Sequence, residues 1–354
     1  MTAKLLQSAI GFAVTALCLW LAFRGIEPAT VMARIAGANW GYVVPMTGVL
    51  VVFFALKSYR WALLLRPVAA VPVGSAAQAL LIGFMGNNVL PLRLGEGMRA
   101  VVLSRRHGLS AAAVLSSIVL ERLLDAASAV ALLVVAVACL PELGEVIPGL
   151  AAWVTLAACG VAAIFGGLTL YVLRTEWFVA VASRLLRAVR FVPDGFVLRI
   201  EGLLRSGSLG MDALRRPRLG LPIVAVSLAK WVVVATLPWL ALAAFGRSLS
   251  PAASAMTNSV IALGIAAPSA PGFFGVVQYC FRVSVVPLGV PPETAVAASW
   301  LYHVVQFVPV TLIGLGCLWA TGLGWRRVSD GGVEPLPIDG TPDGVVSRDE
   351  TLAA

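Results

Sequence analysis

Apolar runs of about the length that crosses a lipid bilayer recur along almost the whole chain. A transmembrane helix needs roughly 18 or more predominantly apolar residues in succession. The runs cover residues 5–23, 40–56, 109–140, 150–173, 219–245 and 293–321. Only 12% of the residues are charged and 60% are hydrophobic, whereas a typical soluble domain carries roughly 25% charged residues. This composition cannot supply a soluble surface, so the sequence predicts an all-α polytopic membrane protein with about six full transmembrane helices.

The net charge of +9 fits membrane topology better than nucleic-acid binding. The cations gather at the ends of the apolar runs, where Lys and Arg set orientation and meet anionic headgroups. Lys57, Arg60 and Arg66, with Trp61 among them, are interpreted as one such cytoplasmic end. Residues 174–218 hold nine arginines and four acidic residues. This arginine-rich segment is predicted to be a cytoplasmic loop with an interfacial amphipathic helix.

The same charge bias predicts a multi-pass protein of the bacterial inner membrane with both termini in the cytoplasm. The first apolar run is too long for the core of a signal peptide and lacks an A-x-A cleavage site, so it is expected to be a retained span. Residues 1–322 are predicted to form the integral membrane domain. Residues 323–354, rich in Gly, Pro and Asp, are predicted to be a disordered cytoplasmic tail.

Two apolar stretches, 74–104 and 252–287, are interrupted in the middle and are predicted to be re-entrant helical hairpins. A break in the helix at membrane depth is tolerated only where protein or a water-filled cavity surrounds it. The residues expected to break the helices are Pro91, Gly95, Pro268, Pro271 and Gly272. For the first stretch, a cytoplasmic loop carrying an amphipathic helix is the alternative.

The two broken stretches can be laid on each other as an inverted repeat. Pro91 and Gly95 match Pro268 and Gly272, because both pairs are four residues apart. A second match, between Gly108 and Gly289, requires a four-residue gap between the two registers. Inverted repeats of this kind recur in secondary transporters, where the substrate site lies between the repeats near the bilayer midplane.

The strongest candidate for a functional site is the string Glu121-Arg122-x-x-Asp125 in a predicted membrane helix. Glu121 and Asp125 lie four residues apart and share a face, and Arg122 can pair with Asp125. Charged side chains at this depth usually face a cavity or a partner. The alternative is a structural ion pair that fixes this helix to Arg93 or Arg99.

The first break and the last helix supply the other candidates. Freed backbone N–H groups at a break favour an anion, and arginine recognises phosphate bidentately. His303 and Gln306 are expected to lie opposite the charges, although a helix-packing hydrogen bond is the simpler interpretation for His303. The predicted substrate-binding residues are Asn87, Asn88, Arg93, Glu96, Arg99, Glu121, Arg122, Asp125, His303 and Gln306.

Signatures of soluble enzymes are absent from the sequence. It contains no P-loop, G-x-S-x-G, H-E-x-x-H or D-x-D motif, so no catalytic residue is assigned. Its five cysteines form no C-x-x-C pair. We therefore expect neither a metal nor a cofactor.

Four strings of residues give the chain a family resemblance. They are Leu56-Lys57-Ser58-Tyr59-Arg60-Trp61, the segment from Gly83 to Arg99, Glu121-Arg122-Leu123-Leu124-Asp125, and the segment from Ala267 to Gly275. Together they resemble the flippase-like membrane domain of the lysylphosphatidylglycerol synthase transmembrane family. The resemblance implies a lipid-handling protein, here expected to be a member without the soluble synthase domain, so aminoacyl transfer is not implied.

The leading hypothesis is a flippase that moves a membrane lipid between leaflets without ATP. The resemblance leaves an aminoacyl-phospholipid, a hopanoid and a polyprenyl-linked lipid as candidate substrates. One alternative is an integral membrane enzyme or accessory subunit of envelope-lipid synthesis. Another is a scaffold that recruits a lipid synthase through the arginine-rich segment. Membrane lipids are the expected partners in each case, and nucleic acid is not.

Overall fold

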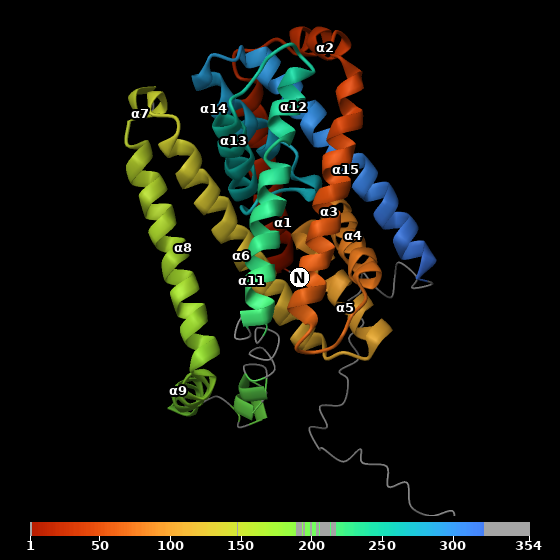
Figure 1. Cartoon of the computed structure of the whole chain (residues 1–354), viewed down its shortest axis with the longest axis vertical. Coiled ribbons are helices and arrows are strands. Elements are labelled where there is room, and N and C mark those ends of the chain that lie inside the picture. Colours follow the sequence, from red (N-terminus) through yellow and green to blue (C-terminus); the bar gives the residue numbers. More distant parts are fainter. Residues whose placement is uncertain are drawn as a thin grey trace, which may run out of the picture.

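The apolar runs form long helices in the computed structural model (Figure 1). The structure describes residues 2–146, 148–188 and 217–321, together with residues 193, 195–198, 200–202, 205 and 213. The predicted tail, 323–354, and much of the arginine-rich loop lie outside these residues. No β-strand occurs in the described part of the chain.

The predicted spans and the observed helices coincide closely because a long apolar run leaves few other ways to satisfy its backbone in lipid. The helices, with short 3₁₀ helices labelled η, are α1 (Thr2–Phe23), α2 (Pro28–Ala36), η1 (Trp40–Tyr42), α3 (Val43–Leu65), α4 (Val73–Val89), η2 (Pro91–Arg93), α5 (Gly95–His107), α6 (Ala111–Ala138), α7 (Glu142–Val146), α8 (Leu150–Leu173), α9 (Thr175–Ala188), α11 (Pro217–Val234), α12 (Leu237–Ala243), α13 (Pro251–Gly264), η4 (Pro271–Phe273), α14 (Val276–Val285), η5 (Val286–Leu288) and α15 (Pro292–Ala320).

Four of the described helical segments are long and apolar enough to cross a membrane, or five if the bent pair α1 and α2, which turns by 77°, counts as one span. The four are Trp40–Leu65, Arg218–Ala243, Pro271–Leu288 and Pro292–Ala320. Helix α6 has 28 residues but holds three charges within one span length, and α8 has 24 residues. The multi-pass architecture is confirmed, whereas the count of six crossings stays a prediction.

The outer faces of these helices are apolar. Trp319 on α15, Leu221 on α11 and Trp153 on α8 are 88%, 76% and 71% exposed, respectively. Several lysine and arginine side chains are instead completely buried. Apolar groups outside and charges inside reverse the arrangement of a soluble protein and suit a protein whose surroundings are lipid.

Both broken stretches form helical hairpins, whereas their re-entrant character stays a prediction. Helix α4 packs against α5, and α13 packs against α14. The breaks, η2 and η4, contact each other, although the two hairpins enter from opposite ends of the molecule (Figure 1). The first stretch is therefore a hairpin paired with the second one rather than a loop carrying a separate amphipathic helix.

Helices α4, α5 and α6 form one half of an inverted repeat, and α13, α14 and α15 form the other half. Helix α4 packs against α15, and its counterpart α13 packs against α6, the counterpart of α15. In Figure 1, α6 rises from the end that holds α4 and α5, while α15 descends from the end that holds α13 and α14. Each half thus places its hairpin against the long helix of the other half.

The residue register of the repeat differs from the predicted one. Leu92 and Arg93 adopt left-handed φ angles of 61° and 55°, and Gly272 and Phe273 adopt 75° and 61°. Each pair follows the proline that starts its 3₁₀ helix, so Pro91 corresponds to Pro271 and not to Pro268. Gly95 then corresponds to Gly275, and the match of Gly108 to Gly289 is out of register by one residue instead of four.

Candidate functional site

Eight charged side chains from α3, α5, α6 and α11 meet inside the membrane domain, and we call them the charged cluster. Their positions follow from helical spacing, because residues three or four apart lie on one face of a helix. The cluster consists of Lys57 and Arg60 on α3, Glu96 and Arg99 on α5, Glu121, Arg122 and Asp125 on α6, and Lys230 on α11.

Glu121 is fully buried and contacts three cations. Its carboxylate lies 2.5 Å from Lys57 Nζ, 2.7 Å from Arg99 Nη1 and 3.5 Å from Arg60 Nη2. One turn before it, the Ser117 hydroxyl accepts a hydrogen bond from the Trp61 indole at 3.1 Å. Helices α3, α5 and α6 are therefore joined through one carboxylate.

Asp125 holds α11 in the same way. Its Oδ1 accepts hydrogen bonds from Arg60 Nη2 and Lys230 Nζ, both at 2.6 Å. Its Oδ2 accepts one from Lys57 Nζ at 2.8 Å. Arg60 also donates to Ser227 Oγ on α11 at 3.0 Å. Asp125 thus places one negative charge among three cations and reduces their mutual repulsion in a low-dielectric interior.

Glu96 and Arg122 form the accessible side of the cluster. Glu96 pairs with Arg99 at 2.8 Å and with Arg122, and it accepts a hydrogen bond from Asn87 Nδ2 at 3.3 Å. The Arg122 side chain is 42% exposed and that of Glu96 is 24% exposed. A ligand can therefore reach these two residues without the cluster being dismantled.

The charged cluster carries an excess of positive charge. Five cationic side chains face three carboxylates, which leaves two formal positive charges unbalanced. Arg60 Nε and Arg99 Nε are also buried without a hydrogen-bond partner in the described part of the chain. Part of the cationic charge is stabilised by aromatic rings instead, since Arg99 lies 4.8 Å from the ring centroid of Trp61.

A cavity of about 390 Å³ lies between the breaks of the two hairpins and α1. Arg93 lines it, and its guanidinium donates to the carbonyl oxygens of Ile265 and, at 3.2 Å, Ala267. These carbonyls follow the end of α13, where the helix dipole favours a cation. Arg93 therefore connects the first hairpin to the second.

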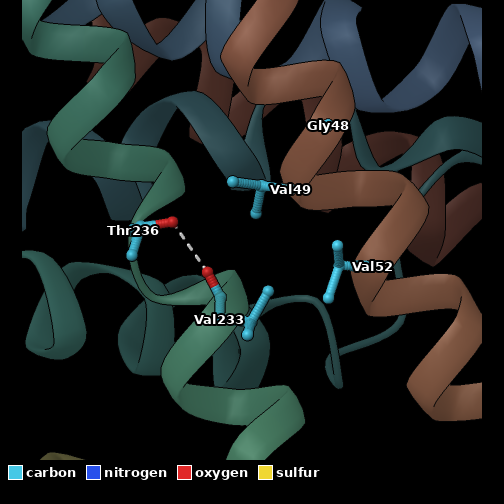
Figure 2. A pocket seen from close by; sticks show the side chains of 5 residues that line it. All are labelled: Gly48, Val49, Val52, Val233 and Thr236. Carbon is cyan, nitrogen blue, oxygen red and sulfur yellow. Dashed lines mark hydrogen bonds between the residues drawn. The ribbon is translucent and has the colours of Figure 1, made fainter.

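A second hollow, of about 350 Å³, lies on the surface between α3 and α11 (Figure 2). Its walls are Gly48, Val49, Val52, Val233 and Thr236. The Thr236 hydroxyl donates to the Val233 carbonyl at 2.7 Å and so offers little polarity to a ligand. This hollow suits a hydrocarbon chain rather than a headgroup.

The comparison with protein families identifies the group to which the chain belongs. The family model described as the lysylphosphatidylglycerol synthase TM region matches residues 8–314 of the sequence. The chain belongs to this family. The match covers both hairpins and every residue of the charged cluster, so the resemblance inferred from the four strings is confirmed.

Among curated proteins, this member of the lysylphosphatidylglycerol synthase TM family is similar to one named glycosyltransferase AglD, from Haloferax volcanii. The two are 26% identical over 328 residues, which is 86% of this chain and 52% of that protein. The chain thus spans about half the length of this relative. No solved structure matches it. Family and relative together suggest a membrane protein of envelope-lipid metabolism.

The predicted site residues separate into two groups in this family member. Asn87, Glu96, Arg99, Glu121, Arg122 and Asp125 meet at the charged cluster. Asn88 instead donates to Thr311 on α15 at 2.8 Å. Arg93 contacts the second hairpin rather than the cluster, and Gln306 donates to the Tyr302 carbonyl of its own helix at 3.1 Å.

One expectation about pairing was wrong. Arg122 pairs with Glu96 and not with Asp125, because Asp125 faces α3 and α11 while Arg122 faces α5. The structural alternative for Glu121 holds, since this residue does bind Arg99. An ion pair that holds α5 and α6 together can also be part of a functional site.

Three members of the cluster were missed. Lys57 and Arg60 were interpreted as a cytoplasmic end, yet they are 1% and 0% exposed. Lys230 sits within a predicted span and is 1% exposed. The signal was present, because Lys57 and Arg60 are three residues apart and so share a helix face, and an ionisable residue within a span usually has a partner.

His303 fixes the second break rather than facing the charges. Its Nε2 lies 2.8 Å from the Gly272 carbonyl oxygen and its Nδ1 lies 3.0 Å from the Gln278 amide nitrogen. Gln278 in turn accepts from the Gly275 N–H at 2.7 Å. The simpler interpretation, a packing hydrogen bond, therefore describes His303.

Replacing His303 by phenylalanine is expected to lower the free energy of unfolding by about 1–3 kcal/mol, because two buried polar partners lose their hydrogen bonds. Unfolding in detergent micelles, followed by tryptophan fluorescence, measures the change. His107→Phe is the matched control, since His107 Nε2 has no hydrogen-bond partner within the described residues. Equal stability of the two variants would contradict a structural role for His303.

Metal ligands do not gather in the described part of the chain. No group of three or more His, Cys, Asp or Glu side chains there could hold an ion.

Proposed function

We propose that this protein moves the polar headgroup of an envelope lipid between the leaflets of the membrane. The observation that carries the proposal is the charged cluster, which lies inside a membrane domain and reaches the surface at Glu96 and Arg122. A headgroup crossing hydrocarbon alone must lose its water without compensation. Charges fixed in the protein replace that water, so they lower the barrier.

The inverted repeat supports movement rather than static binding. Two hairpins that enter from opposite ends and meet at their breaks can form alternative arrangements of similar energy, which is the basis of alternating access in transporters with inverted repeats. The apolar hollow between α3 and α11 supports the proposal, because an apolar outer surface lets lipid tails stay in the bilayer. The sequence has no ATP-binding motif, which favours passive or ion-coupled movement.

Reconstitution into liposomes tests the proposal. Lipids with a fluorescent label on the tail are incorporated, and the fraction accessible to a membrane-impermeant quencher is followed with time. The protein is expected to accelerate exchange between leaflets for at least one of phosphatidic acid, phosphatidylglycerol and lysylphosphatidylglycerol. Unchanged rates for all three would reject the flippase function.

Replacing Arg122 by glutamine is expected to slow that exchange about tenfold or more, because a charge-assisted hydrogen bond contributes roughly 1.5–3 kcal/mol. Arg66→Gln is the matched control, since Arg66 is an exposed arginine at the end of α3, outside the cluster. The comparison is made at equal amounts of folded protein. A similar rate for both variants would exclude Arg122 from the path of the headgroup.

A second candidate is an integral membrane enzyme or accessory subunit of envelope-lipid synthesis. The name of the curated relative, a glycosyltransferase, favours it. Mass spectrometry of the lipids recovered from the same liposomes separates the two functions. A headgroup that changes its mass when an activated sugar is supplied would support the enzyme, whereas an unchanged headgroup that changes leaflet supports the flippase.

A further inference from the structure

The sign of the charge in the cluster restricts the class of headgroup. We infer that the cluster binds a phosphate group carrying up to two negative charges, such as a phosphomonoester or a diphosphate, and not a cationic aminoacyl headgroup. This inference rests on the proposed function for its physiological meaning. Its physical basis is the excess of two positive charges among eight side chains that are mostly withdrawn from solvent.

No carboxylate of the cluster is available for an ammonium group. Glu121 and Asp125 each contact three cations, and Glu96 contacts two. An incoming ammonium would have to displace an arginine or lysine from one of them. It would also add positive charge where positive charge is already in excess, and like charges in a low-dielectric site repel strongly.

A phosphate group meets the opposite situation. The Arg122 side chain is 42% exposed and pairs with Glu96, and guanidinium groups match phosphate oxygens with two parallel hydrogen bonds. Arg60 Nε and Arg99 Nε are buried donors without a partner in the described structure. Because Glu96 Oε2 and Glu121 Oε1 also lack a hydrogen-bond partner in the described structure, it is the excess of two positive charges and the partly exposed Arg122 side chain that favour an anion.

The second half of the repeat does not duplicate this site. In the register set by Gly108 and Gly289, Tyr302 and Gln306 occupy the positions of Glu121 and Asp125. In the register set by the two breaks, Val276 and Tyr279 occupy those of Glu96 and Arg99. The cluster therefore has no charged counterpart at these positions of the second half. Its excess charge comes from Lys57 and Arg60 on α3 and Lys230 on α11, because the members on α5 and α6 alone comprise two cations and three carboxylates.

The test compares phosphatidic acid, phosphatidylglycerol and lysylphosphatidylglycerol with identical acyl chains. Binding to the full-length protein is measured by native mass spectrometry from detergent micelles, and exchange between leaflets is measured separately. Phosphatidic acid is expected to bind about tenfold more tightly than phosphatidylglycerol, the ratio given by one further charge-assisted hydrogen bond. Lysylphosphatidylglycerol is expected to bind most weakly.

Two variants sharpen the result. Arg122→Gln should remove the preference for phosphatidic acid, while Arg66→Gln should keep it. Glu96→Gln should tighten the binding of phosphatidic acid, because it releases Arg122. If a cationic headgroup were the ligand, Glu96→Gln would instead weaken the binding of lysylphosphatidylglycerol, and that result would overturn the inference.

The outcomes separate the headgroup class from the proposed function. Preferential binding of phosphatidic acid without any exchange between leaflets would support the headgroup class and reject the flippase. Exchange that is equally fast or faster for lysylphosphatidylglycerol would reject the headgroup class and support the flippase. Inorganic phosphate, added alone at millimolar concentration, should not displace phosphatidic acid. Displacement would assign the site to soluble phosphate and overturn the inference for lipids.

Discussion

Replacing Asp125 by asparagine is expected to lower the free energy of unfolding by about 3–5 kcal/mol, the cost of leaving buried charges without their partner. Asp125 lies within 2.8 Å of Lys57 Nζ and 2.6 Å of Arg60 Nη2 and Lys230 Nζ. The amide has the same size and can still accept hydrogen bonds, so packing is retained. What is lost is the charge that holds three cations together.

The Lys230→Met variant is the matched control for this prediction. Lys230 is as buried as Asp125's other partners, but its removal leaves Asp125 paired with Lys57 and Arg60. The large cost of removing one partner of a buried ion pair comes from the charge left uncompensated. No such charge is left here, so a change of about 1 kcal/mol is expected.

The double variant completes a thermodynamic cycle. Without Lys230, the loss of Asp125 leaves two cations facing each other instead of three, so Asp125→Asn should cost less in the Lys230→Met background. The measurement is unfolding in mixed micelles, followed by tryptophan fluorescence. Equal costs of Asp125→Asn in both backgrounds would show that the two residues do not interact energetically.

The fold could be predicted from the sequence to a large extent because its strongest determinants are local. Apolar runs of span length set the long helices, and Pro91 with Gly95 interrupts one of them. The register of the repeat could not be obtained in this way. Pro268 and Gly272 have the same four-residue spacing as Pro271 and Gly275, and only the backbone angles of the two breaks decide between the pairs.

The candidate site could be predicted only in part, for a similar reason. Glu121 and Asp125 were identified because carboxylates are costly within an apolar run. Lys57 and Arg60 follow an apolar run, where cations facing cytoplasmic water look the same in sequence as cations facing another helix. Their partners on α6 lie far along the chain, so tertiary packing alone reveals which case applies.

Replacing Gly95 by alanine is expected to destabilise the protein by roughly 3 kcal/mol or more, above the usual cost of overpacking. A Cβ atom at Gly95 would lie 1.9 Å from the Gly83 carbonyl oxygen and 2.6 Å from the Asn87 backbone nitrogen. Both atoms belong to the backbone of α4, so no side-chain rotation relieves the clash. The two arms of the first hairpin would have to move apart.

The same displacement should reach the charged cluster, because the turn of α5 that begins at Gly95 carries Glu96 and is followed directly by Arg99. Shifting α5 away from α4 would lengthen the 2.7 Å contact between Arg99 and Glu121, so lipid exchange should fall together with stability. Gly97→Ala is the control, since no atom lies within 4 Å of a Cβ at that position. Alanine there should stabilise the helix by about 0.5–1 kcal/mol. If both variants unfold at the same denaturant concentration, close packing of α4 against α5 at Gly95 does not hold the hairpin together.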